Sequence, residues 1–342
     1  MRLLRASQRL MNEIKIFCPA TIANLSCGFD VLGLCLATAG DEMIVRKSDE
    51  KGVRITKIVG ADLPLETEKN VAGVAALALL RSIKKVGNKY IPIDYEIDFD
   101  NDNAIDIDID FGFEIEIYKH IKAGSGIGSS AASSAGAVFG INELLGQPFT
   151  RHELVKFAMR GEKLASGNAH ADNVAPCLLG GFTLVRCTSP LDIVRINSPS
   201  ELYATVVHPQ IELKTSDARS VLKQTVSLKS AITQWGNVGG LVAGLYTNDY
   251  ELIGRSLHDE IIEPVRSVLI PGFDLIKKTA YDNGALGSGI SGSGPSIFAL
   301  SKGKEIAEKI AAAMSKVYDE INLPYEIHVS QVNPDGVRII TY

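Results

Sequence analysis

Apolar and polar residues alternate along several short segments of the chain, and this period of two predicts β-strands. Residues 13–18 and 41–48 alternate in this way, and we expect the two segments to pair. The strongest alternation spans 93–118, where acids alternate with apolar residues and the letters NDNA at 101–104 predict a turn. We expect strands with one apolar and one acidic, solvated face. A calcium site is the alternative, but the glycine and glutamate spacing of an EF-hand loop is absent.

A different pattern predicts helices. Residues 69–85 form a helical stripe whose apolar members are Val71, Val74, Ala75, Ala78 and Leu79. Thr150, with Glu153 three residues later, predicts a capping box at the start of another helix. Helices dominate from about 217 to 285. The remaining predicted elements are a helix near 303–317 and strands near 181–187, 202–208, 325–331 and 337–341. This order without repeats predicts an α/β or α+β enzyme.

The chain length of 342 residues predicts two domains. We place the boundary near Ser189-Pro190, which gives a first domain of 12–189 and a second of 190–342. Residues 1–11 begin with a basic stretch that contains no acid. That stretch lacks the apolar centre of a targeting segment, so we expect a disordered tail or an upstream start codon.

Two glycine-rich segments are candidates for binding an anion. GSGIGSS at 124–130 lies between a predicted strand and a predicted helix, an arrangement that directs amide N–H groups and the helix dipole toward phosphate. It is neither a Walker A motif nor a G-x-G-x-x-G motif. GSGISGSGP at 287–295 contains G-x-G-x-x-G, but between a helix and a strand, the reverse of the dinucleotide-binding order. Either segment alone could be a tight turn; the two together favour phosphate.

Composition narrows the class of function. Apolar residues make up 46% of the chain and charged residues 22%, which is typical of a soluble globular protein. The net charge of −5 gives no electrostatic footprint for nucleic acid or an anionic membrane, and we expect neither as a partner. No apolar run approaches the ~20 residues of a bilayer span. Five scattered cysteines favour reduced thiols in the cytoplasm.

Three motifs resemble the GHMP kinases, the family of galactokinase, mevalonate kinase and their relatives. GSGIGSSAA at 124–132 is similar to the family's phosphate loop, although Ile127 replaces a leucine and the preceding proline is missing. PATIANLSCGFDVLGLCL at 19–36 and GSGISGSGPSIFAL at 287–300 resemble its N- and C-terminal motifs, in the same order. The resemblance implies an ATP- and Mg²⁺-dependent kinase with the α+β GHMP fold. That fold joins a ribosomal-protein-S5-like domain, with a left-handed β-α-β phosphate-binding unit, to a ferredoxin-like C-terminal domain, and the family habit is a homodimer.

Further segments resemble the branch of this family that phosphorylates homoserine. They are GFDVLGL at 28–34, SGNAHADNVAPCLLGGF at 166–182, KTSDAR at 214–219 and EPVRSVLIPGF at 263–273. The resemblance implies L-homoserine as the phosphate acceptor, with O-phospho-L-homoserine as the product on the path to threonine. Three alternatives stay open: a GHMP kinase for another small alcohol, a non-catalytic ligand sensor on the same fold, and a dinucleotide-binding oxidoreductase.

The resemblance also assigns nucleotide and metal residues. The triphosphate is expected at Lys122, Gly124, Ser125, Gly126, Ile127, Gly128, Ser129 and Ser130, and the adenine near Asn70. Mg²⁺ is expected at Ser130 and Glu162. Glu162 lies four residues after Ala158, at the border of its helix's apolar stripe, where it can reach a cation. The alternative is a surface glutamate paired with Arg160 or Lys163.

An amino-acid acceptor needs partners for a carboxylate, an ammonium and a hydroxyl. Arg219 and Arg266 are candidates for the carboxylate, which guanidinium groups bind through two parallel hydrogen bonds; surface charges are the alternative. By resemblance, Asn24 and Asp30 hold the ammonium and hydroxyl end.

By the same resemblance, His170 and Asn173 line the acceptor pocket. Asp30 could instead be a turn residue, and His170 an ordinary loop histidine. The residues expected to act in catalysis are Asp30, Ser130, Glu162 and Asn173. Asp172 receives no role, because Asn173 can occupy the position where related kinases have a base.

Overall fold

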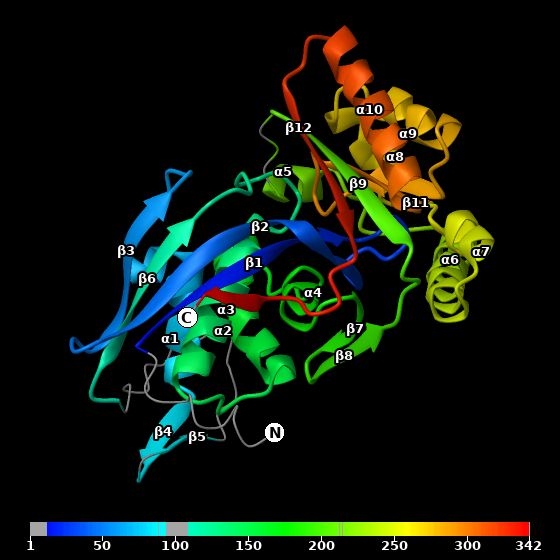
Figure 1. Cartoon of the computed structure of the whole chain (residues 1–342). Coiled ribbons are helices and arrows are strands. Elements are labelled where there is room, and N and C mark those ends of the chain that lie inside the picture. The colour runs from blue at the N-terminus through cyan, green and yellow to red at the C-terminus, as the bar shows by residue number, and fades with distance from the viewer. Residues whose placement is uncertain (1–11, 88, 94–108, 212, 214, 342) are drawn as a thin grey trace.

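The computed structural model of the chain describes residues 12–87, 89–93, 109–211, 213 and 215–341. Two β-sheets, each covered by helices, form the two parts of the molecule (Figure 1). The first sheet contains β1 (Glu13–Ala23), β2 (Leu32–Ser48), β3 (Gly52–Val59), β6 (Gly112–Tyr118), β7 (Phe182–Thr188), β8 (Leu191–Ile196) and β13 (Arg338–Thr341). Its order is β13-β1-β2-β6-β3, with β7 between β2 and β8. Only the β3–β6 pair is parallel among its described strands.

Helices α1 (Val71–Leu80), α2 (Ser129–Leu144) and α4 (Val174–Leu179) pack against the first sheet, and α3 (Arg151–Ser166) packs against these three helices. The alternation predicted for β1 places Ile14, Ile16 and Cys18 in the core. Two glycines of α2 allow the helix to lie against these strands. A Cβ at Gly136 would overlap Cys18, and one at Gly140 would lie 2.5 Å from a methyl group of Val45. The close helix-to-sheet distance therefore depends on the small-residue composition of α2.

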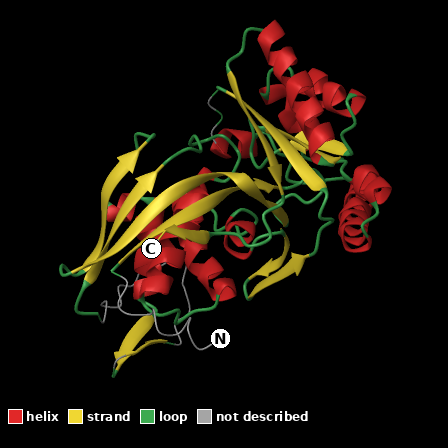
Figure 2. Cartoon of the chain, viewed as in Figure 1, coloured by secondary structure: helices red, strands yellow, loops and turns green. Residues whose placement is uncertain are grey.

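The second sheet has the strand order β10-β11-β9-β12. Its strands are β9 (Leu202–Pro209), β10 (Gly287–Ile290), β11 (Ile297–Lys302) and β12 (Tyr325–Gln331). The helices of this part are α5 (Thr215–Ser220), α6 (Leu228–Thr247), α7 (Tyr250–Ser256), α8 (Glu263–Arg266), α9 (Phe273–Asp282) and α10 (Lys304–Glu320). A strand, helices, two strands, a helix and a strand follow one another along the chain (Figure 2). This β-α-β-β-α-β order confirms the ferredoxin-like prediction.

The remaining short elements are a hairpin of β4 (Ile83–Val86) and β5 (Lys89–Pro92) and the 3₁₀ turns η1 (Thr67–Lys69) and η2 (Ser267–Leu269). Within the described ranges, none of the helices combines the length and apolar character that a bilayer crossing requires.

Several predicted elements are confirmed, and some were wrong. The strands at 13–18 and 41–48 pair as expected, and the capping box of Thr150 and Glu153 is present in full. The helix predicted for 69–85 ends at Leu80, where a strand soon follows. Its predicted stripe was also wrong, because α1 packs between α2 and α3 and buries residues on several faces.

The second glycine segment was also misassigned in part. Gly287–Ile290 is the strand β10, paired with β11, and only the residues after it form a turn. The acidic face predicted for 93–118 can be followed from 109 onward. Asp110 pairs with Lys51 and Lys85, and in β6 Glu114 and Glu116 pair with Arg54 and Arg46. The predicted turn at 101–104 and the tail at 1–11 lie outside the described residues.

The expected domain boundary near Ser189-Pro190 falls in the turn between β7 and β8, two paired strands of the first sheet. The second sheet begins with β9 at Leu202, and β13 returns to the first sheet beside β1. We therefore propose that the first domain comprises 12–196 together with β13, and that the second occupies the chain between them.

Candidate active site

The loop 124–130 leads into the first turn of α2. Gly124, Gly126 and Gly128 have φ angles of 72°, 83° and 74°, in the left-handed region where a side chain is unfavourable. Ala132 N–H donates the first hydrogen bond of α2, to the Gly128 carbonyl (2.9 Å). The amides that precede it in this turn have no acceptor within the helix. Together with the positive end of the helix dipole, they form a site for an anion.

Close packing fixes the conformation of this loop. A Cβ added at Gly126 would lie 2.6 Å from the carbonyl oxygens of Ser291 and Gly294, and one at Gly128 would overlap the Thr21 hydroxyl. Ser291 Oγ also donates to the Gly126 carbonyl (2.8 Å). The two glycine segments that the sequence singled out therefore meet, and the second supports the first.

A buried ion pair lies beneath the loop. Lys119 Nζ binds Asp41 Oδ2 and also donates to the Ser129 carbonyl (2.9 Å). The other oxygen of Asp41 accepts the N–H groups of His120 (2.7 Å) and Ile121 (2.8 Å). Because every charge of this pair has hydrogen-bond partners, it can remain buried, and it holds the chain that enters the loop.

Glu162 and Ser130 are brought together, as the sequence analysis expected. Glu162 on α3 is only 7% exposed, and its carboxylate accepts a hydrogen bond from Ser130 on α2. Its Oε1 atom is buried with no hydrogen-bond partner among the described residues. Burial raises the pKa of Glu162 to about 7, although the Ser130 hydrogen bond and the charge of Lys119 lower it. Glu162 is therefore not the surface glutamate of the alternative hypothesis.

This environment suits an oxygen-binding cation. A buried carboxylate oxygen without a partner is costly unless a proton or a cation satisfies it. The described residues contain no cluster of three or more His, Cys, Asp or Glu side chains able to hold a metal. Mg²⁺ commonly needs only one or two carboxylates, because water and substrate phosphates complete its coordination. Glu162 and Ser130 beside an anion-binding loop fit that pattern.

Asn24 and Asp30 lie in a loop that follows β1. Both have positive φ angles, of 73° and 60°. Asn24 Nδ2 donates to the Gly292 carbonyl (2.7 Å), and Asn24 Oδ1 accepts the Asp30 N–H (3.0 Å). Arg219 of α5 donates to Asp30 Oδ1 (2.7 Å). A carboxylate and a guanidinium group thus lie side by side at the surface of the site, in reach of a zwitterionic ligand.

Arg266, at the end of α8, is buried with 2% exposure and is not the surface charge of the alternative hypothesis. Its Nε donates to the Ala218 carbonyl (2.8 Å), and its guanidinium carbon lies 5.0 Å from the centre of the Phe29 ring. Arg219 stacks on the same ring at 5.4 Å. Burial lowers the pKa of Arg266 to about 10, so the group remains charged near neutral pH.

The segment before α4 contributes three more polar side chains. His170 Nδ1 lies 3.9 Å from Asp30 Oδ1, and burial lowers the pKa of this histidine. Asn173 Oδ1 accepts a hydrogen bond from Thr21 Oγ1 (2.7 Å), next to Gly128. Burial raises the pKa of Asp172 to about 7, and the charges of two neighbouring carboxylates add to the effect. The acceptor side and the phosphate side therefore meet at this segment.

Three predicted nucleotide residues have structural partners of their own. Ser129 Oγ donates to the Ile121 carbonyl (3.0 Å) rather than remaining free for phosphate. Asn70 caps α1 by accepting the Ala72 N–H (3.0 Å), and it is buried. Lys122 lies at the loop, where its Nζ donates to Gln210 Oε1 (2.9 Å). Their roles toward a nucleotide stay predictions.

Three further residues near the loop were not predicted from the sequence: Thr21, Asp41 and Lys119. Thr21 lies inside the motif at 19–36, and its N–H donates to the Ile127 carbonyl (3.1 Å). The signal for Lys119 was present: it is the one cation directly after a run in which acids alternate with apolar residues. Its partner Asp41 is 78 positions away, which no local pattern could have revealed.

Comparisons with known proteins agree with this geometry. The family model for the GHMP kinases N-terminal domain matches residues 96–181, and the model for the GHMP kinases C-terminal domain matches residues 241–320. The chain belongs to the GHMP kinases, a family of ATP-dependent kinases. Within that family it belongs with the homoserine kinases, as full-length relatives show.

The homoserine kinase of Chlorobium phaeobacteroides (strain DSM 266) is 45% identical over 338 residues, which cover 96% of this chain and 100% of that protein. That of Chlorobaculum tepidum is 44% identical, covering 97% and 99%. The crystal structure of a homoserine kinase from Cytophaga hutchinsonii superimposes with a TM-score of 0.87 at 51% identity, covering 97% and 99%. A mevalonate kinase from L. major, at 17% identity and a TM-score of 0.64 with 93% and 96% covered, shares the fold.

Proposed function

We propose that this protein transfers the terminal phosphoryl group of ATP to the side-chain hydroxyl of L-homoserine. The product is O-phospho-L-homoserine, an intermediate of threonine biosynthesis. The observation that carries this proposal is the paired Asp30 and Arg219, with Arg266 buried beside them, next to the anion-binding loop. An amino acid presents one ammonium and one carboxylate, and these groups can replace the contacts that Asp30 and Arg219 make with each other.

The nucleotide side follows from the loop geometry. The triphosphate lies over 124–130, where first-turn amides of α2 bind its oxygens. Phosphoryl transfer depends mainly on positioning and on neutralising charge. When bound, Mg²⁺ would neutralise charge on the transferring phosphate. Glu162 and Ser130 would hold it, and the unpartnered Oε1 of Glu162 supports that role.

On the acceptor side, Asn24 and Asp30 receive the ammonium end, and Arg219 and Arg266 receive the carboxylate. Asn173, held by Thr21 beside Gly128, lies between the two substrates and orients the hydroxyl. His170 closes the pocket near Asp30. The adenine lies toward the start of α1, where Asn70 fixes the helix end.

The test is an assay of ADP release with L-homoserine, mevalonate, galactose and shikimate, each at several concentrations. We expect turnover with homoserine at a kcat/KM at least about tenfold above that for any other acceptor. Replacement of Arg219 by Ala should reduce this preference. Equal turnover of mevalonate, which carries no ammonium group, would contradict the assignment of the acceptor.

We also propose that the protein works in the cytoplasm as a homodimer. The five cysteines are all unpaired, which suits a reducing compartment. On α6, Leu228, Ile232 and Trp235 are 70%, 51% and 58% exposed, at spacings of four and three residues. Lys229 is the one charged residue on that 20-residue helix. An exposed apolar stripe of this kind is typical of an interface between subunits.

Light scattering coupled to size exclusion tests the assembly. We expect the mass of a dimer, and a monomer for Trp235→Glu. A monomeric unmodified protein at micromolar concentration would contradict the proposal.

A further inference from the structure

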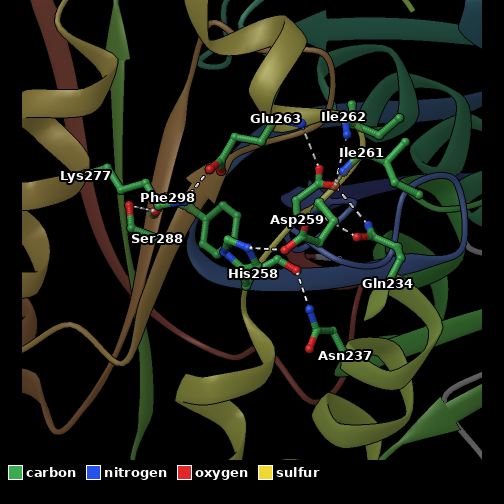
Figure 3. A network of polar contacts seen from close by, with 11 residues as sticks. Gln234, Asn237, His258, Asp259, Ile261, Ile262, Glu263, Lys277, Ser288 and Phe298 are labelled. Atoms are coloured by element: carbon green, nitrogen blue, oxygen red, sulfur yellow. Dashed lines mark hydrogen bonds and ion pairs between the residues drawn. The ribbon is translucent and has the colours of Figure 1, made fainter. Parts of the chain in front are cut away.

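Asp259 is a buried carboxylate just ahead of the helix that carries Arg266. Its Oδ1 accepts the N–H groups of Ile261 (2.9 Å) and Ile262 (3.0 Å), and its Oδ2 accepts that of Glu263 (3.0 Å) (Figure 3). Helix α8 is a single turn, and its formal N-cap residue provides no side-chain cap. One carboxylate therefore satisfies amides that would otherwise lack an acceptor.

The position of Arg266 depends on that turn. A four-residue helix is not stable alone, because the energetic gain of helix formation comes only after the first turn. Arg266 is the last residue of α8, and it reaches the Ala218 carbonyl of α5, next to Arg219. A shift in the start of α8 would therefore move Arg266 directly. It would also disturb the hydrogen bond from Arg266 to the Ala218 carbonyl, next to Arg219.

Gln234, on α6, connects Asp259 to the opposite side of the acceptor pocket. Its Nε2 donates to Asp259 Oδ1 (3.0 Å) and to the Cys27 carbonyl (2.9 Å), and its Oε1 accepts the Glu260 N–H (2.9 Å). Figure 3 shows the amide of Gln234 directed at the Asp259 carboxylate. One side chain thus contacts both the loop that carries Asn24 and the segment that leads into α8.

The loop around Cys27 needs external support. Four non-glycine residues in this loop have positive φ angles: Asn24 (73°), Leu25 (45°), Ser26 (59°) and Asp30 (60°). Such conformations are costly and persist only where surrounding contacts enforce them. The Gln234 bond to the Cys27 carbonyl is one of those contacts, and it comes from the other domain.

We propose that Gln234 and Asp259 are positioning residues that set the distance between the two ends of the acceptor pocket. They join the loop 24–30, which receives the ammonium end, to α8, which carries a carboxylate-binding arginine. The pair would therefore select acceptors that carry both groups on one carbon. This inference rests on the proposed roles of Asn24, Asp30 and Arg266, and neither Gln234 nor Asp259 needs to touch the substrate.

Steady-state kinetics of Gln234→Leu and Asp259→Asn test the proposal. We expect the homoserine KM to rise about 10- to 30-fold, with kcat within about threefold and the ATP KM unchanged. Asn237→Leu is the matched control, because Asn237 lies on the same helix and its Nδ2 donates to the His258 carbonyl (3.0 Å) instead. It should leave the homoserine KM unchanged.

A double-mutant cycle separates this proposal from the function on which it rests. In an Arg266→Ala background, Gln234→Leu should add less than about threefold to the homoserine KM, because Gln234 acts through the position of Arg266 and residues coupled through one backbone segment give non-additive effects. If wild-type protein turns over homoserine and Arg266→Ala raises its KM, the function stands. An unchanged KM in both Gln234→Leu and Asp259→Asn, or an equal rise in the ATP KM, then overturns the positioning role alone. Should one variant fail to fold, the other decides the outcome.

Discussion

The two sides of the proposed active site are built from different kinds of contact. On the proposed nucleotide side, the main-chain amides and glycines belong to the single stretch 124–130, and neighbouring segments pack closely against it. On the acceptor side, charged side chains meet from distant positions: Asp30 and Arg219 are 189 residues apart, and Asn24 and Gly292 are 268 apart. A substitution on the nucleotide side should therefore change the shape of the loop. A substitution on the acceptor side should lower the affinity for the acceptor alone.

The largest effect is expected from Glu162→Gln, at the junction of the two sides. Loss of the carboxylate removes the charge that would hold the cation, and we expect kcat to fall about 10²- to 10³-fold, as for other single electrostatic groups in active sites. ADP release at saturating substrates measures it. Glu143→Gln, at the far end of α2, is the control and should retain full activity. Normal turnover in Glu162→Gln would remove Glu162 from the metal site.

Gly128→Ala tests whether shape dominates the nucleotide side. The new Cβ would overlap the Thr21 hydroxyl at a φ of 74°, and we expect kcat/KM for ATP to fall about 100-fold. Gly146→Ala is a matched control, since its φ is also positive at 86° but nothing lies within 4 Å of the added atom. That control should lose about 1 kcal/mol of stability and no activity. Similar losses of activity in Gly128→Ala and Gly146→Ala would show that backbone strain, rather than close packing against Thr21, causes the effect.

Arg219→Ala tests whether the acceptor side is specific to one substrate. We expect the homoserine KM to rise about 10- to 50-fold, the range that loss of a charge-assisted hydrogen bond produces, while the ATP KM stays within twofold. Initial rates over a grid of both substrates measure the two constants. Arg255→Ala on α7 removes an exposed arginine and should change neither. An increase in both KM values would mean that the two sides are not separable.

The effect of pH should appear in stability rather than in turnover, because buried carboxylates occur where the two sides meet. The folded-state pKa values of Glu162 and Asp172 are raised to about 7, above the 4.5 and 3.8 of exposed groups. Between about pH 4 and pH 7 the folded state therefore binds more protons than the unfolded state, and its stability falls as pH rises. At about 1.4 kcal/mol for each pKa unit, each of the two groups lowers the free energy of unfolding by about 3 to 4 kcal/mol across this window.

Urea unfolding of protein without Mg²⁺ and nucleotide measures this dependence. Glu162→Gln should flatten the slope, and added Mg²⁺ with nucleotide should restore stability at pH 8. If the free energy of unfolding rose from pH 5 to pH 7 in both the unmodified protein and Glu162→Gln, the raised pKa values of the two buried carboxylates would be contradicted.

The smallest effect should come from Thr150→Ala, remote from both substrates. Thr150 Oγ1 accepts the Glu153 N–H and the Glu153 carboxylate accepts the Thr150 N–H, so the cap of α3 would be lost. Caps of this kind are worth about 1 kcal/mol. Thermal unfolding should record that loss while kcat is unchanged. A large fall in kcat would mean that the start of α3 controls the position of Glu162.

The same contrast explains what could be predicted from the sequence. The loop 124–130 and the capping box of Thr150 were predictable because each depends on residues within a few positions of one another. The approach of Glu162 to Ser130 was implied by the family resemblance alone, because periodicity placed only Glu162, at the border of its helix's apolar stripe. The loop and the capping box are local features, and short patterns describe them well.

Contacts between distant segments could not be predicted in that way. Nothing near Lys119 indicates Asp41, and nothing near Gln234 indicates Cys27, because the fold alone brings them together. The buried face of α1 was predicted wrongly because the helix is apolar on several faces and so has no single apolar stripe. The strand Gly287–Ile290 was missed because its two glycines suggest a turn, whereas pairing with β11 makes it a strand.

The final strand β13 lies beside β1, so the polypeptide crosses between the sheets twice, after β8 and again after β12. In the proposed division, the second domain is thus inserted within the first and connected to it at both ends. Severing the chain near residue 199 would leave the first sheet without an edge strand, and the two pieces would have to reassociate in order to complete it. Two covalent connections also restrict twisting of one domain on the other more than a single linker would.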